Sequence, residues 1–154
     1  MISDNSSFVI SGIELKNRSW SNTTGLIQGV TTITSSNEAK KDFNGFQNTQ
    51  SIAEYTHASA AYECAVTQFK NGQMGYLASV GEWMEIINNL DEINKCMSLI
   101  DGLDIDEGAT SYWTSTQYNY EKAWLVTYNG NEFYPNDERK SASFYAIRVI
   151  SQLI

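Results

Sequence analysis

Gly75-Tyr76-Leu77-Ala78-Ser79-Val80-Gly81-Glu82-Trp83 is the stretch that decides the fold, because it contains a well-marked helix start. The Ser79 hydroxyl can accept from the Glu82 amide while the Glu82 carboxylate reaches back to the Ser79 amide, which is a capping box. Asp101-Gly102 ends the segment, and Asn88-Asn89 leaves open whether it is one helix or two short ones. Apolar residues recur at helical spacing and predict one buried face: Val80, Trp83, Ile86 or Ile87, Leu90, Ile93 and Met97.

An earlier helix is predicted from about Thr56 to Lys70. Asn71-Gly72 follows it directly and can supply the left-handed residue that stops a helix. Burial of its larger apolar residues, at about 1.5–3 kcal/mol each, is enough to dock the helix on a sheet. Its apolar face consists of Ala58, Ala61, Tyr62, Ala65, Val66 and Phe69.

The C-terminal part of the chain is predicted to form strands. Tyr112-Trp113-Thr114-Ser115-Thr116 and residues 123–128 are rich in β-branched and aromatic residues. Asn129-Gly130 is a strong hairpin signal, residues 131–134 return from it, and Phe144 to Ile150 form a last strand. Two helices followed by such strands predict an α+β fold, with the two helices packed on a twisted antiparallel sheet.

The N-terminal part is less regular. Phe8-Val9-Ile10 and residues 26–33 are β-prone and bounded by Gly, Ser and Asn. Residues 35–42 are polar and predict a loop, and Asn44-Gly45 predicts a turn. We therefore expect an N-terminal β-rich segment over residues 1–42, which is part of or appended to a domain over residues 43–154.

Charge and composition argue against several classes of protein. The 154 residues carry a formal net charge of −8 with only 10 Lys and Arg, whereas nucleic acid and anionic membranes attract clustered cations. No apolar run approaches the roughly 20 residues of a membrane span, and the first residues show no signal peptide. A charged content of only 18%, with many Tyr, Asn, Ser and Thr, is typical of extracellular or virion surface proteins.

Patterns of catalytic residues are largely absent. His57 is the single histidine and falls at a predicted helix start. There is no nucleophile elbow and no Gly-rich phosphate loop. Cys64 and Cys96 fall in predicted helices, where we expect two buried thiols, and a disulfide between the helices is the alternative. With one His they cannot form a zinc site of standard spacing.

One acidic loop could hold a cation. Its carboxylates belong to Asp101, Asp104, Asp106 and Glu107, and oxygen ligands at short spacing suit calcium. The spacing is not that of an EF-hand, so a solvated acidic loop is the default interpretation. We therefore expect no metal site.

Tyrosine and asparagine are concentrated near the C-terminus. Tyr offers a large contact area at little cost in rotamer entropy, and Asn adds adaptable hydrogen bonds, which is the chemistry of a binding surface. Tyr112 and Tyr128 lie inside predicted strands, where Tyr is simply a good strand residue. Gln117-Tyr118-Asn119-Tyr120-Glu121 falls in a predicted loop, where exposed aromatics gain nothing from a core.

An ordered set of motifs carries a family resemblance. Gly75-Tyr76-Leu77-Ala78-Ser79 with Gly81-Glu82-Trp83 resembles a W-Y-L-P-S-x-G-E-L motif, and Tyr112-Trp113-Thr114-Ser115-Thr116 resembles a Y-W-S-S-T strand. Further matches are Asn48-Thr49, Ile52-Ala53, Ala123-Trp124, Gly130, Lys140 and Ile147-Arg148-Val149. The family is that of bacterial and phage C-type-lectin-fold domains, which includes the variable proteins of diversity-generating retroelements and related gut-bacterial paralogous domains. Ala78 replaces the usual Pro, and the C-terminus lacks the usual V-R-P-V-R run.

The resemblance implies roles for particular residues. Trp113 and Trp124 would belong to the scaffold, and Lys140 and Arg148 would make structural hydrogen bonds. Pro135 would form a turn, so recognition without calcium is expected. The catalytic cysteine pair of the formylglycine-generating enzymes, which share the fold, has no counterpart here. The expected ligand-binding residues are Gln117, Tyr118, Asn119, Tyr120, Glu121, Asn129, Asn131, Glu132, Tyr134, Asn136 and Tyr145.

These expectations favour a non-enzymatic binding domain without a cofactor. It would be displayed on a virion, as in a phage fibre, or on an extracellular surface, and would recognise a protein or glycan receptor on a cell. The alternative is a structural or assembly subunit of a virion or surface appendage that uses the same surface to form a homo-oligomer. An enzyme on this fold would need a polar pocket with a perturbed acid or a metal.

Overall fold

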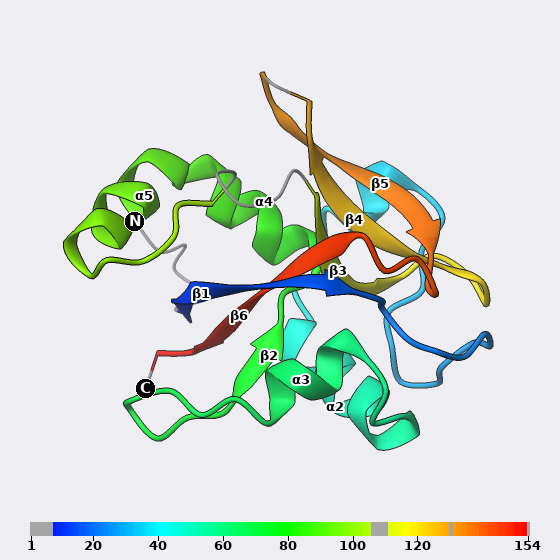
Figure 1. The fold of residues 1–154 in the computed structure, drawn as a ribbon. Helices are drawn as coiled ribbons and strands as arrows, with labels where there is room; N and C mark the ends of the chain where they lie inside the picture. The colour runs from blue at the N-terminus through cyan, green and yellow to red at the C-terminus, as the bar shows by residue number, and fades with distance from the viewer. Residues whose placement is uncertain (1–7, 106–110, 130, 154) are drawn as a thin grey trace.

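The structure is a computed structural model that describes residues 8–105, 111–129 and 131–153. Strands and helices are interspersed along the chain, and the last four elements are all strands (Figure 1). The elements are β1 (Phe8–Arg18), α1 (Ser36–Ala39), α2 (Gly45–Tyr55), α3 (Ala60–Ala65), β2 (Gly75–Leu77), α4 (Val80–Asn88), α5 (Leu90–Leu99), β3 (Ser111–Gln117), β4 (Lys122–Tyr128), β5 (Phe133–Arg139) and β6 (Tyr145–Gln152).

One six-stranded sheet organises the molecule. Its strand order is β1-β6-β3-β4-β5, and β2 also pairs with β6. The fold is therefore mixed α/β, with helices and strands in the same unit. The expected antiparallel pairing holds except between β3 and β6, which pair in parallel through Tyr112 and Ala146. The parallel pair arises because β6 returns from β5 to lie beside β3, between β3 and β1.

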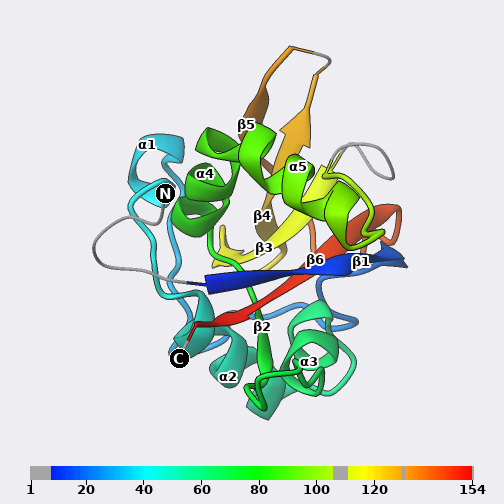
Figure 2. The ribbon, with the colours of Figure 1, turned by 90° about the vertical axis from the view of Figure 1, so that its left-hand side faces the viewer.

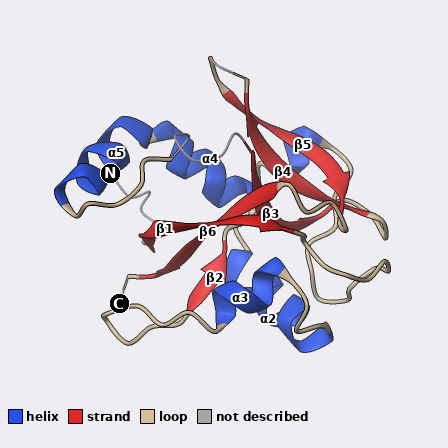
Figure 3. Cartoon of the chain, viewed as in Figure 1, coloured by secondary structure: helices blue, strands red, loops and turns tan. Residues whose placement is uncertain are grey.

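Helices cover both faces of the sheet, so the molecule has three layers rather than helices on one face only (Figures 2 and 3). α4 and α5 lie on one face, where Trp83 stacks on Tyr112 at a ring distance of 4.8 Å. α2 and α3 lie on the other, where Ile52 packs in a cluster with Trp20 and Trp113. All seven residues of β3 are buried, since this strand is covered on both sides.

The predicted helix from Thr56 to Lys70 is wrong in its limits. The chain instead forms α2 before it and the short α3 within it, because Thr56 has an extended backbone with φ −152° and ψ 134°. Ser59 then caps α3 by accepting from the Tyr62 amide at 3.1 Å. The polar loop expected over residues 35–42 contains α1, and the β-prone residues 26–33 contribute only one bridge, Thr32 to Gln117.

The capping box at Ser79 and Glu82 is confirmed, since both of its hydrogen bonds are present. The apolar segment that follows is two helices, which divide at Asn89, where the amide donates to the Ile86 carbonyl at 3.1 Å. The expected stop is also present: Asp101 has a φ of 53°, and the Gly102 amide donates to the Met97 carbonyl at 2.8 Å. Local sequence signals thus describe this region well.

The first strand lies in the same sheet as the last. Phe8 pairs with Gln152, so the start of β1 and the end of β6 are side by side. Farther along, Glu14 pairs with Arg148, and their side chains form an ion pair at 2.9 Å with both side chains fully buried. No helix among residues 8–105, 111–129 and 131–153 is long and apolar enough to span a membrane.

The two cysteines have different environments. Cys64 is buried as expected, and burial raises the pKa of its thiol above the ordinary range. Cys96 is exposed, so the expectation of a second buried thiol is wrong. The reason is that α5 turns only a narrow face inward, with Met97 its single buried residue.

Candidate functional site

A buried polar network around Asp42 fixes the centre of the molecule. One oxygen of its carboxylate accepts from the Thr116 hydroxyl at 2.7 Å and from the Asn48 amide at 3.0 Å. The other accepts from the Thr31 hydroxyl and the Asn44 backbone at 3.1 and 2.9 Å. Every oxygen of the carboxylate is therefore satisfied, and we assign the network to the scaffold.

Glu82 is the acid with the most perturbed environment. Burial raises its pKa to about 7, the Ser79 hydrogen bonds lower it, and the charge of Asp42 raises it. A side chain at Gly45 would place its Cβ 2.0 Å from the Glu82 Oε2, so the glycine leaves just enough room for the carboxylate. Glu82 is 4% exposed and enclosed by protein.

Gln117 lies inside the molecule rather than in a ligand-facing loop. Its side chain is fully buried and accepts from the Lys140 ammonium at 2.6 Å. Lys140 also donates to the Gly25 carbonyl at 2.7 Å and lies 4.8 Å from the ring of Trp20. Burial lowers the pKa of Lys140 to about 8. Because Gln117 has no exposed surface, we leave it out of the binding surface proposed below.

Trp113, Trp124, Lys140 and Arg148 all lie in the interior. The indole nitrogens of Trp113 and Trp124 donate to the carbonyls of Arg18 and Ile33, both at 2.8 Å. Arg148 donates to three carbonyls as well as to Glu14. These side chains hold loops against the sheet.

The loop between β3 and β4 is divided between scaffold and surface. Tyr118 packs edge-on against Trp124 at 5.2 Å. The Asn119 side chain accepts from the amides of Glu121 and Lys122, both at 2.8 Å, so it shapes the turn. Tyr120, which is 56% exposed, and Glu121 are left free to face solvent.

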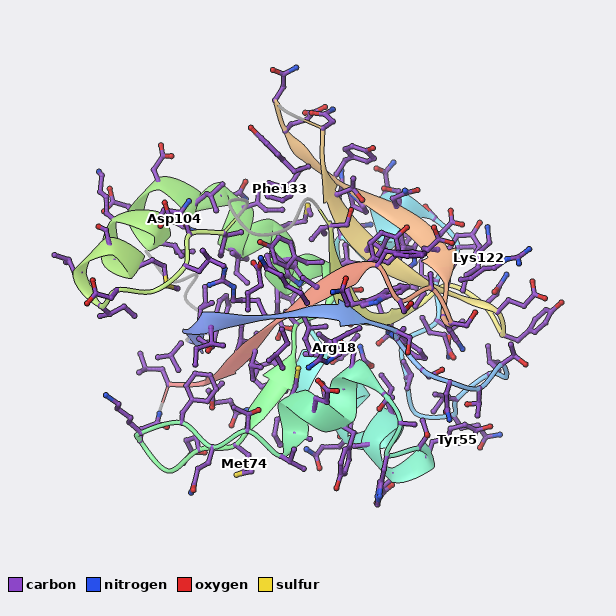
Figure 4. The ribbon with its side chains drawn as sticks, in the orientation of Figure 1. Arg18, Tyr55, Met74, Asp104, Lys122 and Phe133 are labelled. Atoms are coloured by element: carbon purple, nitrogen blue, oxygen red, sulfur yellow. The ribbon has the colours of Figure 1, made fainter. Side chains whose placement is uncertain are left out.

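The loop of Tyr120 lies close to the segment of Gly25, which in turn lies beside the Tyr55 hydroxyl. The Gly25 amide donates to the Tyr120 carbonyl at 2.8 Å, which joins two loops. Leu26 is 57% and Tyr55 53% exposed, and both line a hollow of about 490 Å³. We call Leu26, Tyr55 and Tyr120 the distal surface, because Tyr55 lies on the side of the molecule away from the chain ends marked N and C (Figures 1 and 4).

A second hollow lies between the β4–β5 hairpin and the junction of α4 with α5. The Asn129 side chain shapes the hairpin by accepting from the amides of Asn131 and Glu132 at 3.0 and 2.9 Å. Gly130 of the predicted hairpin signal lies outside the described residues. We call the hollow the hairpin groove. It has a volume of about 770 Å³ and is lined by Met84, Ile87, Asn88, Asn89, Leu90, Asp91, Glu92, Tyr128, Asn131, Glu132 and Phe133.

The remaining expected ligand residues lie elsewhere. Tyr134 and Asn136 point to the sheet face opposite Phe133, since side chains alternate along β5. The Tyr145 hydroxyl donates to Glu138 at 2.9 Å, and its ring packs edge-on against Trp113 at 5.4 Å. The structure therefore spreads the expected residues over the interior, the β3–β4 loop, the hairpin and the sheet face opposite Phe133, rather than gathering them into one site.

The acidic loop is described only in part. Asp106 and Glu107 lie outside the described residues. The Asp104 carbonyl accepts from Arg148 at 3.1 Å, so this end of the loop is held to the core. In the described part of the chain, no group of three or more His, Cys, Asp or Glu is placed to hold a metal ion. His57 stacks on Tyr62 at 4.3 Å instead.

Comparisons with known proteins show a similarity in fold alone. No protein-family model and no curated protein sequence matches the chain. Among solved structures, the chain is similar to a fimbrial protein from Bacteroides ovatus, with a TM-score of 0.66 and 19% sequence identity. The likeness covers 96% of this chain and 36% of the fimbrial protein, so the chain spans about a third of that protein's length. The chain therefore shares its fold with a part of a bacterial fimbrial protein.

Proposed function

We propose that this chain is a non-enzymatic structural module of a bacterial surface appendage. The observation that carries the proposal is the fold likeness to a fimbrial protein, which extends over 96% of the chain. A net charge of −8 and the low charged content of 18% are in keeping with an extracellular surface protein. Among the acids of the described residues, Glu82 is the one with a strongly raised pKa, and it is enclosed in the scaffold, which supports a role without catalysis.

We further propose that the fold is of the C-type-lectin kind. Three features support this: the pairing of β1 with β6, the capped start of α4 directly after β2, and the buried Tyr112-to-Thr116 strand in the middle of the sheet. The flanking helices on both faces belong to the same arrangement. The proposal rests on this scaffold.

The distal surface is the contact that we propose for assembly. Leu26, Tyr55 and Tyr120 are each more than half exposed, and exposed apolar side chains that gather on one surface are typical of a protein interface. The edges of the sheet are less suited to pairing with another chain. Pro135 and three charged residues lie in β5, and register shifts interrupt β1, and both features oppose the addition of a strand.

Immunogold electron microscopy of the source bacterium tests the appendage. Antibodies raised against the purified chain should label filaments on intact cells, and a strain lacking the gene should show no label. Labelling that appears only after the cells are lysed would contradict the proposal. Light scattering of the purified chain tests the surface: Tyr55→Ala/Tyr120→Ala should shift the mass toward monomer, whereas the control Leu99→Ala/Phe144→Ala, at other exposed sites, should not.

A second candidate is a binding module that uses the same distal surface to recognise a protein or glycan on another cell. The observation in its favour is the hollow of about 490 Å³, which the exposed Tyr55 and Leu26 line. Binding to an array of cell-surface glycans and proteins should be lost in Tyr55→Ala/Tyr120→Ala. Tyr118 is unsuited to this test, because its ring supports Trp124 and its loss would disturb the scaffold.

A further inference from the structure

The hairpin groove has two walls that come from distant parts of the sequence. One wall is the junction of α4 and α5, residues 88–92, and the other is the hairpin, with Tyr128, Asn131, Glu132 and Phe133. The α4–α5 division at Asn89 exposes amide and carboxylate side chains at this point. Phe133 lies beside α4 in the side-chain view (Figure 4). The groove is therefore formed by the tertiary fold and has no signature in any single motif.

The floor of the groove is apolar and partly aromatic. The rings of Tyr128 and Phe133 lie 4.8 Å apart, and Phe133 is 6.5 Å from Tyr112 of the core. Met84, Ile87 and Leu90 are half-buried and complete the apolar part. Because Phe133 is held against the core, the floor is a fixed surface on which an aliphatic chain can lie.

The rim of the groove is acidic on both walls. Asp91 and Glu92 belong to the helix wall and Glu132 to the hairpin wall, and no Lys or Arg is among the lining residues. Glu92 forms an exposed ion pair with Lys95 at 3.1 Å, which partly neutralises it. The described residues provide no ion pair for Asp91 or Glu132. Negative charges therefore lie on both walls of the groove, and a cation bound in it would relieve their repulsion.

We propose that the hairpin groove binds a basic segment of a partner protein, with the stem of an Arg or Lys side chain along Tyr128 and Phe133 and its charged head between Asp91 and Glu132. Such side chains combine an apolar stem with a cationic end, so they match an apolar floor below an acidic rim. A cationic head near aromatic rings gains additional attraction from their faces. Nothing in this inference depends on the proposed appendage role, because the groove belongs to this chain alone.

A peptide-binding experiment with the full chain tests the inference. The probes are short fluorescein-labelled peptides with two arginines among apolar residues, and a matched set carries citrulline, which is neutral and of the same shape. Fluorescence polarisation should show binding of the arginine peptides, and Asp91→Asn/Glu132→Gln should weaken it about tenfold or more. Rising salt should weaken the wild-type complex, because the charges at the rim are exposed.

The matched control is Glu54→Gln/Glu121→Gln, which changes the net charge equally at exposed positions outside the groove. It should bind the arginine peptides as the wild type does. The proposal is overturned by equal affinity for arginine and citrulline peptides, by equal weakening in both double variants, or by no binding of any basic peptide. Binding of a neutral oligosaccharide in the groove, seen as NMR shifts at Tyr128 and Phe133 that persist in Asp91→Asn/Glu132→Gln, would overturn it in favour of a glycan.

Discussion

Glu82 is a single carboxylate whose burial makes the stability of the whole protein depend on pH. Its pKa is raised from 4.5 to about 7. Between these two pH values the Glu82 carboxyl is therefore protonated in the folded protein and ionised in the unfolded chain. A raised pKa contributes stability that is fully present below about pH 4.5 and is lost as the pH rises through about 7. The shift corresponds to about 3 kcal/mol.

We expect Glu82→Gln to remove this pH dependence. Glutamine keeps an oxygen that can accept from the Ser79 amide, but it does not titrate. Urea unfolding between pH 4.5 and 7 should therefore show a smaller slope of unfolding free energy against pH than in the wild type. Glu121→Gln, at an exposed position, serves as the control, and an unchanged slope in Glu82→Gln would refute the assignment.

Lys140 is the opposite case, since burial lowers its pKa to about 8. A lowered pKa contributes stability that is present above about pH 10.5 and is lost as the pH falls through about 8. We expect the ¹³Cε resonance of Lys140, assigned by its loss in Lys140→Met, to titrate near pH 8. A midpoint at or above 10.5 would show that Lys140 is better solvated than its contacts with Gly25 and Gln117 indicate.

Single residues also show the limit of what the sequence could predict. The scaffold role of Trp113 and Trp124 was predictable from the motifs around them, and both are buried. Gln117 was expected in a loop, but β3 extends through it. The two-residue period of a strand places Gln117 on the side of Trp113 and Ser115, which was the available signal. No signal in the sequence predicts the hydrogen bonds of Asp42 to Asn48 and Thr116, since residues 42 and 116 are 74 positions apart.

At the scale of elements, the start of α4 is the best-determined feature. The Ser79 hydroxyl donates to the Asp42 carbonyl at 2.5 Å and contacts Glu82, so the cap is joined to the buried network. We expect Ser79→Ala to lower the unfolding free energy by about 1–2 kcal/mol, at the upper end for an N-cap. The matched control is Ser35→Ala at the cap of α1, where the bond to the Glu38 amide is long, at 3.5 Å, and exposed.

Thermal unfolding of the two cap variants makes the comparison. Ser35→Ala should leave the melting temperature close to that of the wild type, because α1 is four residues long and adds one short turn. Ser79→Ala should lower it by several degrees. Equal effects of the two substitutions would mean that the buried surroundings of Ser79 add nothing to an ordinary cap.

Elements with local signals were predictable, and those set by distant contacts were not. β3, β4 and the α4–α5 segment follow from residue periodicity and from the capping box. The break between α2 and α3 does not, because the Ala-rich pattern continues through it. At this break the Asn22 amide donates to the Ala58 carbonyl, and the Ala60 amide donates to the Trp20 carbonyl. The loop that follows β1 therefore determines where α2 ends and α3 begins. The hairpin groove is likewise a product of tertiary packing.

At the scale of the molecule, the pairing of β1 with β6 closes the fold. Glu14 and Arg148 form its buried ion pair, and the Tyr112 hydroxyl also donates to Glu14. We expect Glu14→Ala to lower the unfolding free energy by about 3–5 kcal/mol, because it leaves the Arg148 guanidinium buried without its counter-charge. Glu63→Ala, which breaks the half-exposed pair with Arg18, should cost at most about 1 kcal/mol.

Urea unfolding compares the two variants, and replacement of both partners sharpens the test. Glu14→Leu/Arg148→Met should be less destabilised than Glu14→Ala, since no uncompensated charge is left inside. If the double variant is the less stable of the two, the network of carbonyls around Arg148 contributes more than the charge pair does.

The adjacent ends of β1 and β6 also determine how the domain responds to a mechanical force. Phe8 and Gln152 are partners at one end of an antiparallel pair, so tension applied at these two points separates the strands from that end, one hydrogen bond at a time. Shear, in which many bonds carry the load together, would instead require the two strands to be pulled from opposite ends of the pair. The Glu14–Arg148 ion pair lies partway along the two strands. There it would resist further separation of β1 from β6 before the core is exposed.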